Sequence, residues 1–305
     1  MYDKILKNTY FGVLFTKFII FDLEFNSTKI PNQNKNINEI IEIGAVKLNE
    51  KLKEIDHFSM TVRPKYTKKL NPYTKKITHI TEEELNKSKD FSSVIELFKK
   101  WCGDKDDLVF LSWSDTDLHV IAENYVEFLD IETVDFIKKY TDLQKYISNF
   151  IKTENNNQIS LKTAAEFYKI NTDRFSLHRA MDDSRVCGAM LFKSYNKKLF
   201  KKYIREINDK SFYKRLLFKS YSINNLKDKS IKPEMLLFNC PVCKNQLKFN
   251  GKFSKNKNAF TENIKCDKCK KNIGVTIKIK MTFDGVKTNV FAREIKKSTN
   301  KSAKK

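Results

Sequence analysis

The sequence predicts an α/β protein, with a mixed sheet flanked by helices and a small C-terminal module built around cysteines. The octapeptide at residues 18–25 is mostly large and apolar, which is typical of a strand that is covered on both faces. Strand and helix patterns then alternate as far as about residue 195, as in layered α/β folds. Two Cys-x-x-Cys pairs, at residues 240–243 and 266–269, follow in the last third of the chain.

The first three expected strands are residues 18–25, 39–48 and 54–63. An Asn-rich loop at residues 26–38 separates the first two strands, and the third alternates apolar with polar residues. Together they predict an antiparallel meander.

Helical patterns dominate the next hundred residues. In Phe91–Trp101 the apolar side chains fall on one helical face, and a short apolar strand is expected at residues 108–111. Ser160 is suited to cap the last helix of this part. Three more helices are expected, at residues 118–129, 136–151 and 161–170.

Two carboxylates interrupt the first strand. Asp22 and Glu24 are two residues apart, so both side chains project from the same face. Two buried carboxylates repel each other, and the usual solution is a bound divalent metal ion. On this octapeptide alone, the alternative is a strand end at which both acids reach solvent or a lysine.

Two further acids are candidates for the same site. Asp117 follows the expected strand at residues 108–111, and capping of the next helix is the commoner role for its neighbour Asp115. Asp117 would then face the sheet. In the helical pattern around residue 183, Asp183 shares a face with apolar residues three, four, seven and eight positions later, whereas Asp182 turns toward solvent.

These acids, together with one histidine, resemble the motifs of the DEDDh family of 3′-to-5′ exonucleases, which have a ribonuclease-H-like fold. The resemblance covers about residues 17–195. It implies an enzyme that cleaves phosphodiester bonds with the help of divalent metals. The matching residues are Asp22, Glu24, Asp117, His178 and Asp183.

Two shorter segments refine the resemblance. The segment at residues 112–117 is most similar to the branch that contains KapD-type bacterial exonucleases and the animal exonucleases that trim histone messenger and small RNAs. In that branch a Trp precedes the metal-binding Asp by four residues, as Trp113 precedes Asp117 and not Asp115. Residues 77–81 are similar to the family's loop Leu-Thr-Gly-Ile-Thr. His79 stands where that loop usually has glycine, which is expected to affect the terminal nucleotide and not the metals.

The chemistry of these residues also follows from general principles. Four carboxylates carry four negative charges, which two Mg²⁺ or Mn²⁺ ions neutralise. Two such ions about 4 Å apart hold the attacking water and the leaving oxygen of an in-line phosphoryl displacement. Histidine is suited to remove the water's proton near neutral pH, and its spacing to Asp183 makes His178 the expected base. We interpret the other histidines as structural, namely His57, His79 and His119.

The net charge is concentrated at the C-terminal end. Residues 1–200 contain 31 Lys and Arg against 29 Asp and Glu, whereas residues 201–305 contain 28 against 8, a net charge of +20. Such a field attracts polyanions, either nucleic acid or an anionic membrane surface. No stretch reaches the roughly 18 apolar residues of a membrane span, and residues 2–16 lack a signal cleavage site. We therefore expect a cytoplasmic protein that binds nucleic acid and no membrane.

The cysteines predict one structural zinc ion. Two Cys-x-x-Cys pairs separated by 22 residues indicate a four-thiolate site, with disulfides or a redox pair as alternatives. Alternation at residues 275–280 predicts short strands, and hence a zinc ribbon. Cys102 and Cys187 fit ordinary core positions. The expected ligands are Cys240, Cys243, Cys266 and Cys269.

The expected organisation has five parts. A basic helical pattern at residues 197–222 predicts a connector, so a chain ending near Asn196 is expected to retain hydrolysis. The parts are an N-terminal extension at 1–16, a nuclease domain at 17–195, a basic helical connector at 196–236, a zinc ribbon at 237–292 and a lysine-rich tail at 293–305.

The function predicted from sequence is a metal-dependent 3′-to-5′ exonuclease that releases nucleoside monophosphates from the 3′ ends of single-stranded RNA or DNA. The branch that the chain resembles favours RNA. One alternative is a non-catalytic scaffold that binds nucleic acid, in which the nuclease fold only supports the ribbon. Another is a proofreading exonuclease that acts with a DNA polymerase. The complete set of four acids and one histidine favours catalysis over binding alone.

Overall fold

The protein divides into two compact units, with the boundary between Leu217 and Phe218. The computed structural model describes residues 17–103, 107–151, 158–207, 209–249, 254–256 and 258–295. The predicted N-terminal extension and residues 296–305 of the predicted tail lie outside these described residues, whereas residues 293 and 294 of that tail belong to the last strand. Among the described residues, no helix is both long and apolar enough to cross a membrane.

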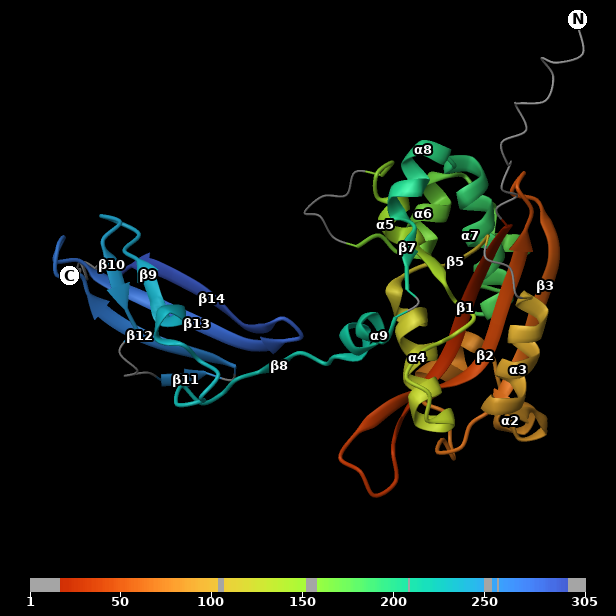
Figure 1. Ribbon diagram of the computed structural model, residues 1–305, viewed down its shortest axis with the longest axis horizontal. Coiled ribbons are helices and arrows are strands. Elements are labelled where there is room, and N and C mark those ends of the chain that lie inside the picture. Colours follow the sequence, from red (N-terminus) through yellow and green to blue (C-terminus); the bar gives the residue numbers. More distant parts are fainter. Residues whose placement is uncertain are drawn as a thin grey trace, which may run out of the picture. The chain divides into compact units, whose positions relative to one another are not determined.

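The first unit is built on a seven-stranded mixed sheet with the order β4-β3-β2-β1-β5-β6-β7 (Figure 1). Strands β1, β2 and β3 form the predicted antiparallel meander, whereas β5 and β6 run parallel to β1. The predicted α/β fold is thus confirmed. The strands are β1 Lys17–Lys29, β2 Asn36–Leu48, β3 Glu54–Arg63, β4 Lys89–Asp90, β5 Leu108–Ser112, β6 Lys139–Asp142 and β7 Arg205–Glu206.

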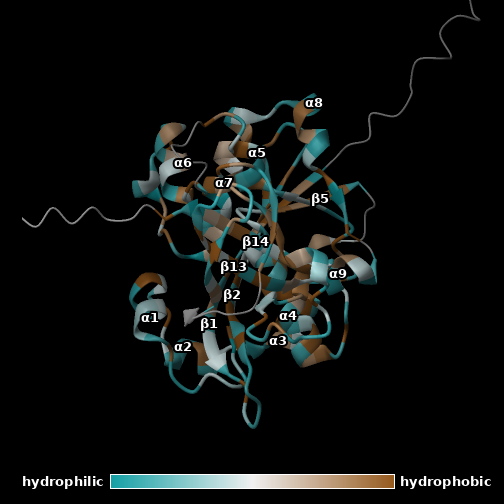
Figure 2. Cartoon of the chain, turned by 90° about the vertical axis from the view of Figure 1, so that its left-hand side faces the viewer, coloured by the Kyte–Doolittle hydropathy of each residue, from teal (hydrophilic) through white to brown (hydrophobic). Residues whose placement is uncertain are grey.

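Helices cover both faces of this sheet. Odd-numbered residues of β1, such as Ile19 and Phe21, enter one core together with residues of α3, α4 and α9. Even-numbered residues, such as Phe18 and Ile20, enter a second core with α5, α6 and α7. The helices accordingly carry both hydrophobic and hydrophilic residues (Figure 2). Their bounds are α1 Pro72–Thr78, α2 Glu82–Lys87, α3 Phe91–Cys102, α4 Asp115–Leu129, α5 Leu143–Ile147, α6 Leu161–Phe167, α7 Ala180–Ser194, α8 Lys197–Phe200 and α9 Lys210–Leu217.

The helix predicted at residues 136–151 is wrong in its first half. Residues 139–142 form β6 between β5 and β7, and Tyr140 and Thr141 are completely buried there. Only α5 is helical, beginning where the Asp142 side chain accepts a hydrogen bond from the backbone N–H of Lys145. The apolar spacing fits a helix, but pairing with two neighbouring strands decides the conformation.

The basic segment at residues 197–222 is not one continuous helix. It contains α8, the 3₁₀ turn Lys201–Tyr203, β7, α9 and β8 (Tyr221–Ser222). Three of its side chains, Phe200, Ile207 and Tyr213, are buried in the two cores of the first unit, and β7 pairs with β6. A chain ending near Asn196 would therefore lose a strand and three core side chains. The first unit ends at Leu217 instead.

The second unit is a β-structure with its own core. Strands β11 to β14 form a sheet in sequence order, β8 adds to β13, and β9 pairs with β10 in a separate hairpin. Along β13 the odd-numbered residues from Ile273 to Ile279 are at most 1% exposed. The strand predicted at residues 275–280 lies within β13. The elements are the 3₁₀ turn Pro233–Leu236, β9 Leu237–Asn239, β10 Gln246–Lys248, β11 Ser254–Asn256, β12 Ala259–Lys265, β13 Asn272–Thr282 and β14 Gly285–Glu294.

Candidate active site

The carboxylates of β1 lie beyond the end of the neighbouring strand. β5 pairs with β1 only between Lys17 and Ile20, so β1 continues past the carboxyl end of β5 with one edge free. Asp22 and Glu24 stand on this extension, half-buried and two residues apart. The free edge leaves room for residues that follow β5 to approach the two acids.

Asp117 fills part of that space from the first turn of α4. Its side chain is 7% exposed, and its Oδ1 atom accepts a hydrogen bond from the backbone N–H of Leu23 at 3.3 Å. Ser114 is the N-cap of this helix, because its side chain accepts a hydrogen bond from the backbone N–H of Thr116. The expectation that Asp115 caps α4 is therefore wrong. The capping residue is its predecessor Ser114, and Asp115 is the first residue of the helix.

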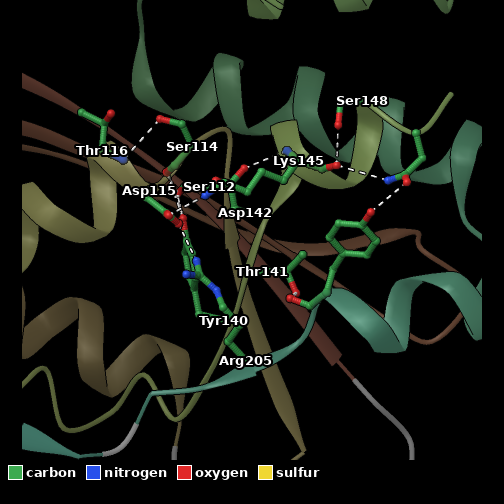
Figure 3. Close-up of polar contacts among 12 residues, drawn as sticks. Ser112, Ser114, Asp115, Thr116, Tyr140, Thr141, Asp142, Lys145, Ser148 and Arg205 are labelled. Atoms are coloured by element: carbon green, nitrogen blue, oxygen red, sulfur yellow. Dashed lines mark hydrogen bonds and ion pairs between the residues drawn. The ribbon is translucent and has the colours of Figure 1, made fainter. Parts of the chain in front are cut away.

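A buried hydroxyl pair holds the backbone that leads into α4 (Figure 3). The Oγ atom of Ser112 lies 2.6 Å from the Oη atom of Tyr140, and both hydroxyls are within hydrogen-bonding distance of the carbonyl oxygen of Ser114. Because Tyr140 belongs to β6, which pairs with β5, these hydrogen bonds connect the turn before Asp117 to the neighbouring strand of the sheet.

Asp115 has a structural role beside this turn. Its carboxylate forms ion pairs with Lys145 at the start of α5 and with Arg205 of β7 (Figure 3). Burial alone would raise the pKa of Asp115, but the hydrogen bonds from Lys145 and the charge of Arg205 lower it below its usual value. The positive side chains of Lys145 and Arg205 thus already neutralise Asp115, whereas Asp117 faces the other acids.

Asp183 lies in the first turn of α7, and His178 lies two residues before that helix. His178 has a left-handed backbone with φ of 67°, and its N–H donates a hydrogen bond to Oδ2 of Asp183 at 3.2 Å. Asp183 is 7% exposed, whereas Asp182 is only partly buried and accepts a hydrogen bond from the backbone N–H of Ser176. The burial of these two acids agrees with the predicted helical register.

Three of the predicted residues meet at this point. A ring nitrogen of His178 and carboxylate oxygens of Glu24 and Asp183 all lie within 4.8 Å of one another. The His178 side chain is exposed, so it stands at the rim of the acid cluster. Among the described residues, the buried Oδ1 atom of Asp183 has no hydrogen-bond partner. A buried carboxylate oxygen without a partner is suited to hold a cation.

The proton affinities of the acids reflect their burial and, after it, their mutual repulsion. Burial, followed by the charges of Asp117, Asp183 and Glu24, raises the pKa of Asp22 well above its usual value. Burial is also the main cause for the others: it raises the pKa of Glu24 to about 9 and those of Asp117 and Asp183 to about 7. Four acids that are this costly to ionise together fit a site for divalent cations, which would offset the repulsion.

Sequence reasoning missed a buried ion pair that supports α7. Glu42 lies opposite Glu24 in the β1–β2 register and is 1% exposed. Its carboxylate accepts two hydrogen bonds from the Nε and one from the Nη2 atom of Arg179, and another from the backbone N–H of Ala180. Glu42 therefore fixes the residues between His178 and α7. A carboxylate at an inward position of a buried strand was the available signal.

A close backbone approach fixes α7 on the sheet. A Cβ atom at Gly44 would lie 2.0 Å from the backbone nitrogen of Met181, so no side chain fits between β2 and this helix. The carbonyl oxygen of Gly44 also accepts a hydrogen bond from the Ser184 hydroxyl at 3.1 Å. Since Gly44 pairs with Asp22 in the β1–β2 register, the contact lies directly beside the acid cluster.

The departure at His79 has a backbone explanation. His79 ends α1 in the left-handed region with φ of 57°, a conformation that glycine adopts at little cost. Thr81 then caps α2 by accepting a hydrogen bond from the backbone N–H of Glu84. The family loop that residues 77–81 resemble usually has glycine at this position, where the backbone needs positive φ. His79 adopts that left-handed conformation here.

The second unit brings the four predicted cysteines together. Their Sγ atoms all lie within 4.8 Å of one another, with Cys240 and Cys269 separated by 3.8 Å and Cys243 and Cys266 by 3.6 Å. A tetrahedral zinc ion with Zn–S bonds of about 2.3 Å needs sulfur atoms about 3.8 Å apart. The thiols therefore fit a four-thiolate zinc site.

Each Cys-x-x-Cys pair makes the same turn. Lys244 and Lys270 both have left-handed backbones, and their N–H groups donate to the carbonyl oxygens of Cys240 and Cys266 at 2.9 and 2.8 Å. The N–H groups of those two cysteines donate in turn to the carbonyl oxygens of Asn245 and Lys271. Two equivalent turns thus present two thiols each.

Comparison with known proteins identifies the first unit. A family model described as Exonuclease matches residues 19–191, which is more than half of the 305 residues. The chain belongs to the exonuclease family. The family predicted from the acids and His178 is therefore confirmed, whereas the cysteines lie outside the matched residues.

The curated relatives of this family member differ in type. ERI1 exoribonuclease 3 from Homo sapiens and from Bos taurus is 27% identical over 138 residues, covering 43% of this chain and 40% of the relative. This chain thus matches about two fifths of the length of these relatives. DNA polymerase III PolC-type from Lacticaseibacillus paracasei is 25% identical over 203 residues, covering 64% of this chain and 12% of the polymerase.

Solved structures of exonucleases share the fold. The nuclease domain of 3′hExo, a DEDDh family member bound to rAMP, has a TM-score of 0.53 at 22% identity and covers 64% of this chain and 98% of that chain. A 3′-exonuclease described in 3′-end-specific recognition of a histone mRNA stem-loop has a TM-score of 0.51 at 21% identity, covering 63% and 85%. The predicted ribonuclease-H-like fold of the first unit is confirmed.

The burial of neighbouring acids allows a paired test in this exonuclease. Asp183→Ala and Asp117→Ala are expected to reduce turnover about 10²-fold more than Asp182→Ala and Asp115→Ala, because only the first two carboxylates face the cluster. The Asp115 change should instead lower the melting temperature, since it leaves Lys145 and Arg205 without their partner. Initial rates and melting curves of all four variants provide the measurement. Equal loss of turnover at Asp182 would contradict the assignment.

Proposed function

We propose that this member of the exonuclease family is a divalent-metal-dependent 3′-to-5′ exonuclease that releases nucleoside monophosphates from single-stranded RNA. The observation that carries the proposal is the convergence of Glu24, Asp183 and the exposed ring of His178 within 4.8 Å, beside the two further acids Asp22 and Asp117. Four acids alone would suit a passive cation site. A histidine at the rim adds a group that can accept a proton.

Each residue has a stated role in this proposal. Asp22, Glu24, Asp117 and Asp183 hold two Mg²⁺ or Mn²⁺ ions, which when bound activate water and stabilise the negative charge of the leaving 3′ oxygen. His178 accepts the proton that the attacking water loses. Glu42 and Arg179 act as positioning residues, because the Glu42 carboxylate, which lies beside the cluster opposite Glu24, is occupied by Arg179 and by the backbone N–H of Ala180.

The choice of RNA is supported by the relatives. ERI1 exoribonuclease 3 is an exoribonuclease by name, and one structural neighbour is described with a histone mRNA stem-loop. The similarity to a DNA polymerase III PolC-type over 64% of this chain favours a second candidate, a proofreading exonuclease that acts on DNA beside a polymerase. A preference for mismatched DNA 3′ ends over single-stranded RNA would select that candidate.

The second unit contributes a structural zinc ion and attraction for nucleic acid in this proposal. The four converging thiols hold the zinc, and a four-thiolate site requires reduced cysteines, which we assign to the cytoplasm. The excess of Lys and Arg in the last third of the chain strengthens binding of the strand's phosphates. Nucleic acid is thus the proposed partner of both units.

The direct test is a degradation ladder. RNA and DNA strands of one sequence, labelled at the 5′ end, are incubated with the protein with and without Mn²⁺. A 3′-to-5′ exonuclease gives a ladder of labelled products that shortens one nucleotide at a time, with the RNA consumed faster. Early release of the labelled terminal nucleotide, or cleavage only at internal positions, would contradict the proposal. Equal degradation without any divalent metal would contradict the role of the acids.

His178→Ala is expected to reduce turnover by about 10²- to 10⁴-fold while leaving metal affinity nearly unchanged, because a base is not a metal ligand. Manganese binding is measured by calorimetry and turnover with labelled RNA. His57→Ala, which removes an exposed histidine of β3, is the matched control. A large loss of manganese affinity in His178→Ala would make this histidine a ligand instead.

A further inference from the structure

One face of the second unit's sheet is open to solvent. On β13 the even-numbered residues point away from the core, and on β14 the odd-numbered residues share that side. The register places Gly274 opposite Arg293, Thr276 opposite Phe291, Lys278 opposite Asn289 and Lys280 opposite Lys287. We call this surface the ribbon face and define it by these eight residues.

Phe291 is an exposed aromatic in the middle of the ribbon face. Its side chain is 58% exposed, and the Nζ atom of Lys278 lies 6.0 Å from its ring centroid. A hollow of about 390 Å³ adjoins the ring, with Thr261, Asn263, Gly274 and Thr276 in its wall. Ile295 and Val275 also line this hollow, and its space beside the exposed ring can admit a flat group.

The ribbon face is also strongly basic. Lys278, Lys280, Lys287 and Arg293 are all exposed, and Glu262 at the edge of the hollow is the acid in its wall. The whole unit, residues 218–305, contains 22 Lys and Arg against 6 Asp and Glu. This positive charge therefore favours a polyanion at the ribbon face over an uncharged, apolar partner.

We propose that the ribbon face binds single-stranded nucleic acid, with a base stacked on Phe291 and the backbone phosphates at the lysines and Arg293. An aromatic platform within a positive groove is the arrangement that single-strand-binding proteins use. Residues on one face of β14 repeat every two positions, or about 6.8 Å, so contacts with a strand can follow one another along it. The exposed charges of Lys278, Lys280 and Lys287 do not resemble the centre of a protein–protein interface, which is depleted of charged residues.

This proposal deepens the proposed exonuclease function by assigning strand capture to a defined surface. Binding is measured in full-length Asp22→Asn protein, which leaves strands uncut, by fluorescence anisotropy of labelled 12-mers of U and of dT. Adding Phe291→Ala is expected to weaken binding about tenfold, whereas Phe291→Trp should retain it because stacking is preserved. Phe167→Ala, at a 54% exposed phenylalanine of α6, is the matched control and should change nothing.

The phosphate contacts are tested through the salt dependence. Replacing Lys278, Lys280 and Lys287 together with glutamine should make the slope of log affinity against log salt shallower by about 2, since each contacted phosphate contributes about 0.7 for single strands. The control replaces the exposed Lys227, Lys229 and Lys232 with glutamine, which removes the same charge elsewhere in the unit. Equal slopes for the two triple variants would overturn the assignment to the ribbon face.

A small substrate separates failure of this proposal from failure of the proposed function. The p-nitrophenyl ester of uridine 5′-monophosphate needs no second unit, so Phe291→Ala with Asp22 restored should hydrolyse it at the wild-type rate. Loss of strand affinity with retained zinc and ester hydrolysis supports the proposal. Unchanged strand affinity in Phe291→Ala overturns it and leaves the face to another partner. If the wild type does not hydrolyse the ester, the proposed function is contradicted, whereas the measured effect of Phe291→Ala on strand affinity still stands.

Discussion

Asp22→Asn is expected to reduce hydrolysis at least about 10⁴-fold while leaving the first unit folded. The loss follows from removing one of four carboxylates that hold the cations, which are worth several kcal/mol to the transition state. In metal-free protein the change should raise the melting temperature by roughly a few degrees, because it removes one of the crowded negative charges. Calorimetry of the first unit and rates with labelled RNA are the measurements.

The pH dependence of this stabilisation has a definite sign. The pKa values of Glu24, Asp117 and Asp183 are raised on folding to about 9, 7 and 7. Their favourable contribution is complete below the unfolded value of about 4 and is lost as the pH rises through these folded values. As these acids ionise, their repulsion with Asp22 increases. The melting temperature of metal-free Asp22→Asn should therefore exceed that of the metal-free wild type by a margin that grows from about pH 4 to about pH 9.

Added manganese should reverse the order of the two melting temperatures. The wild type gains stability by binding the ions, and the variant gains less. Asp56→Asn, an exposed acid on β3 of the same sheet, is the control that should follow the wild type in all conditions. A variant that melts below the metal-free wild type at pH 8, or that keeps metal-dependent cleavage, would overturn the cluster as the cation site.

Cys240→Ser is expected to unfold the second unit and to release its zinc. Cys240 and Cys266 are completely buried and belong to the same core as the inward residues of β13, so the metal site is part of that core. Zinc bound by four thiolates contributes about 10 kcal/mol or more to the folding of small modules. Zinc content by mass spectrometry and amide spectra of residues 218–295 should show the loss together.

The first unit should be unaffected by that change. Cys102→Ser is the matched control, because Cys102 is a buried cysteine of α3 that lies in the core of the first unit. It should keep one zinc per chain. Retention of zinc and of the second unit's spectrum in Cys240→Ser would contradict a four-thiolate site, and loss of zinc in Cys102→Ser would contradict its location.

The parts of the fold that local patterns determine could be predicted. Period-two alternation placed Asp22 and Glu24 on one face of β1, and helical periodicity separated Asp183 from Asp182. Ser160 caps α6 as expected, because a cap is decided by a few adjacent residues. These features need only the geometry of one strand or one helix.

The features that failed depend on residues far apart in the chain. Residues 139–142 have helical spacing, and β6 forms because strands on both sides pair with it. Asp115 looked like a cap, but Lys145 and Arg205 occupy it from 30 and 90 residues away. The Glu42–Arg179 pair likewise joins positions 137 residues apart. Periodicity carries no information on such pairs.

The backbone contact at Gly44 also bears on how freely this sequence can diverge. The separation between Asp22 and the helix that carries Asp183 consists of one strand spacing, about 4.8 Å, and one contact between main chains. Neither length contains a side chain. Substitutions among the large apolar residues on either side of the sheet can therefore shift the outer helices without changing that separation. The apolar core can therefore change its residues while the distances within the acid cluster stay constant. Position 44 cannot change, because only glycine fits against α7.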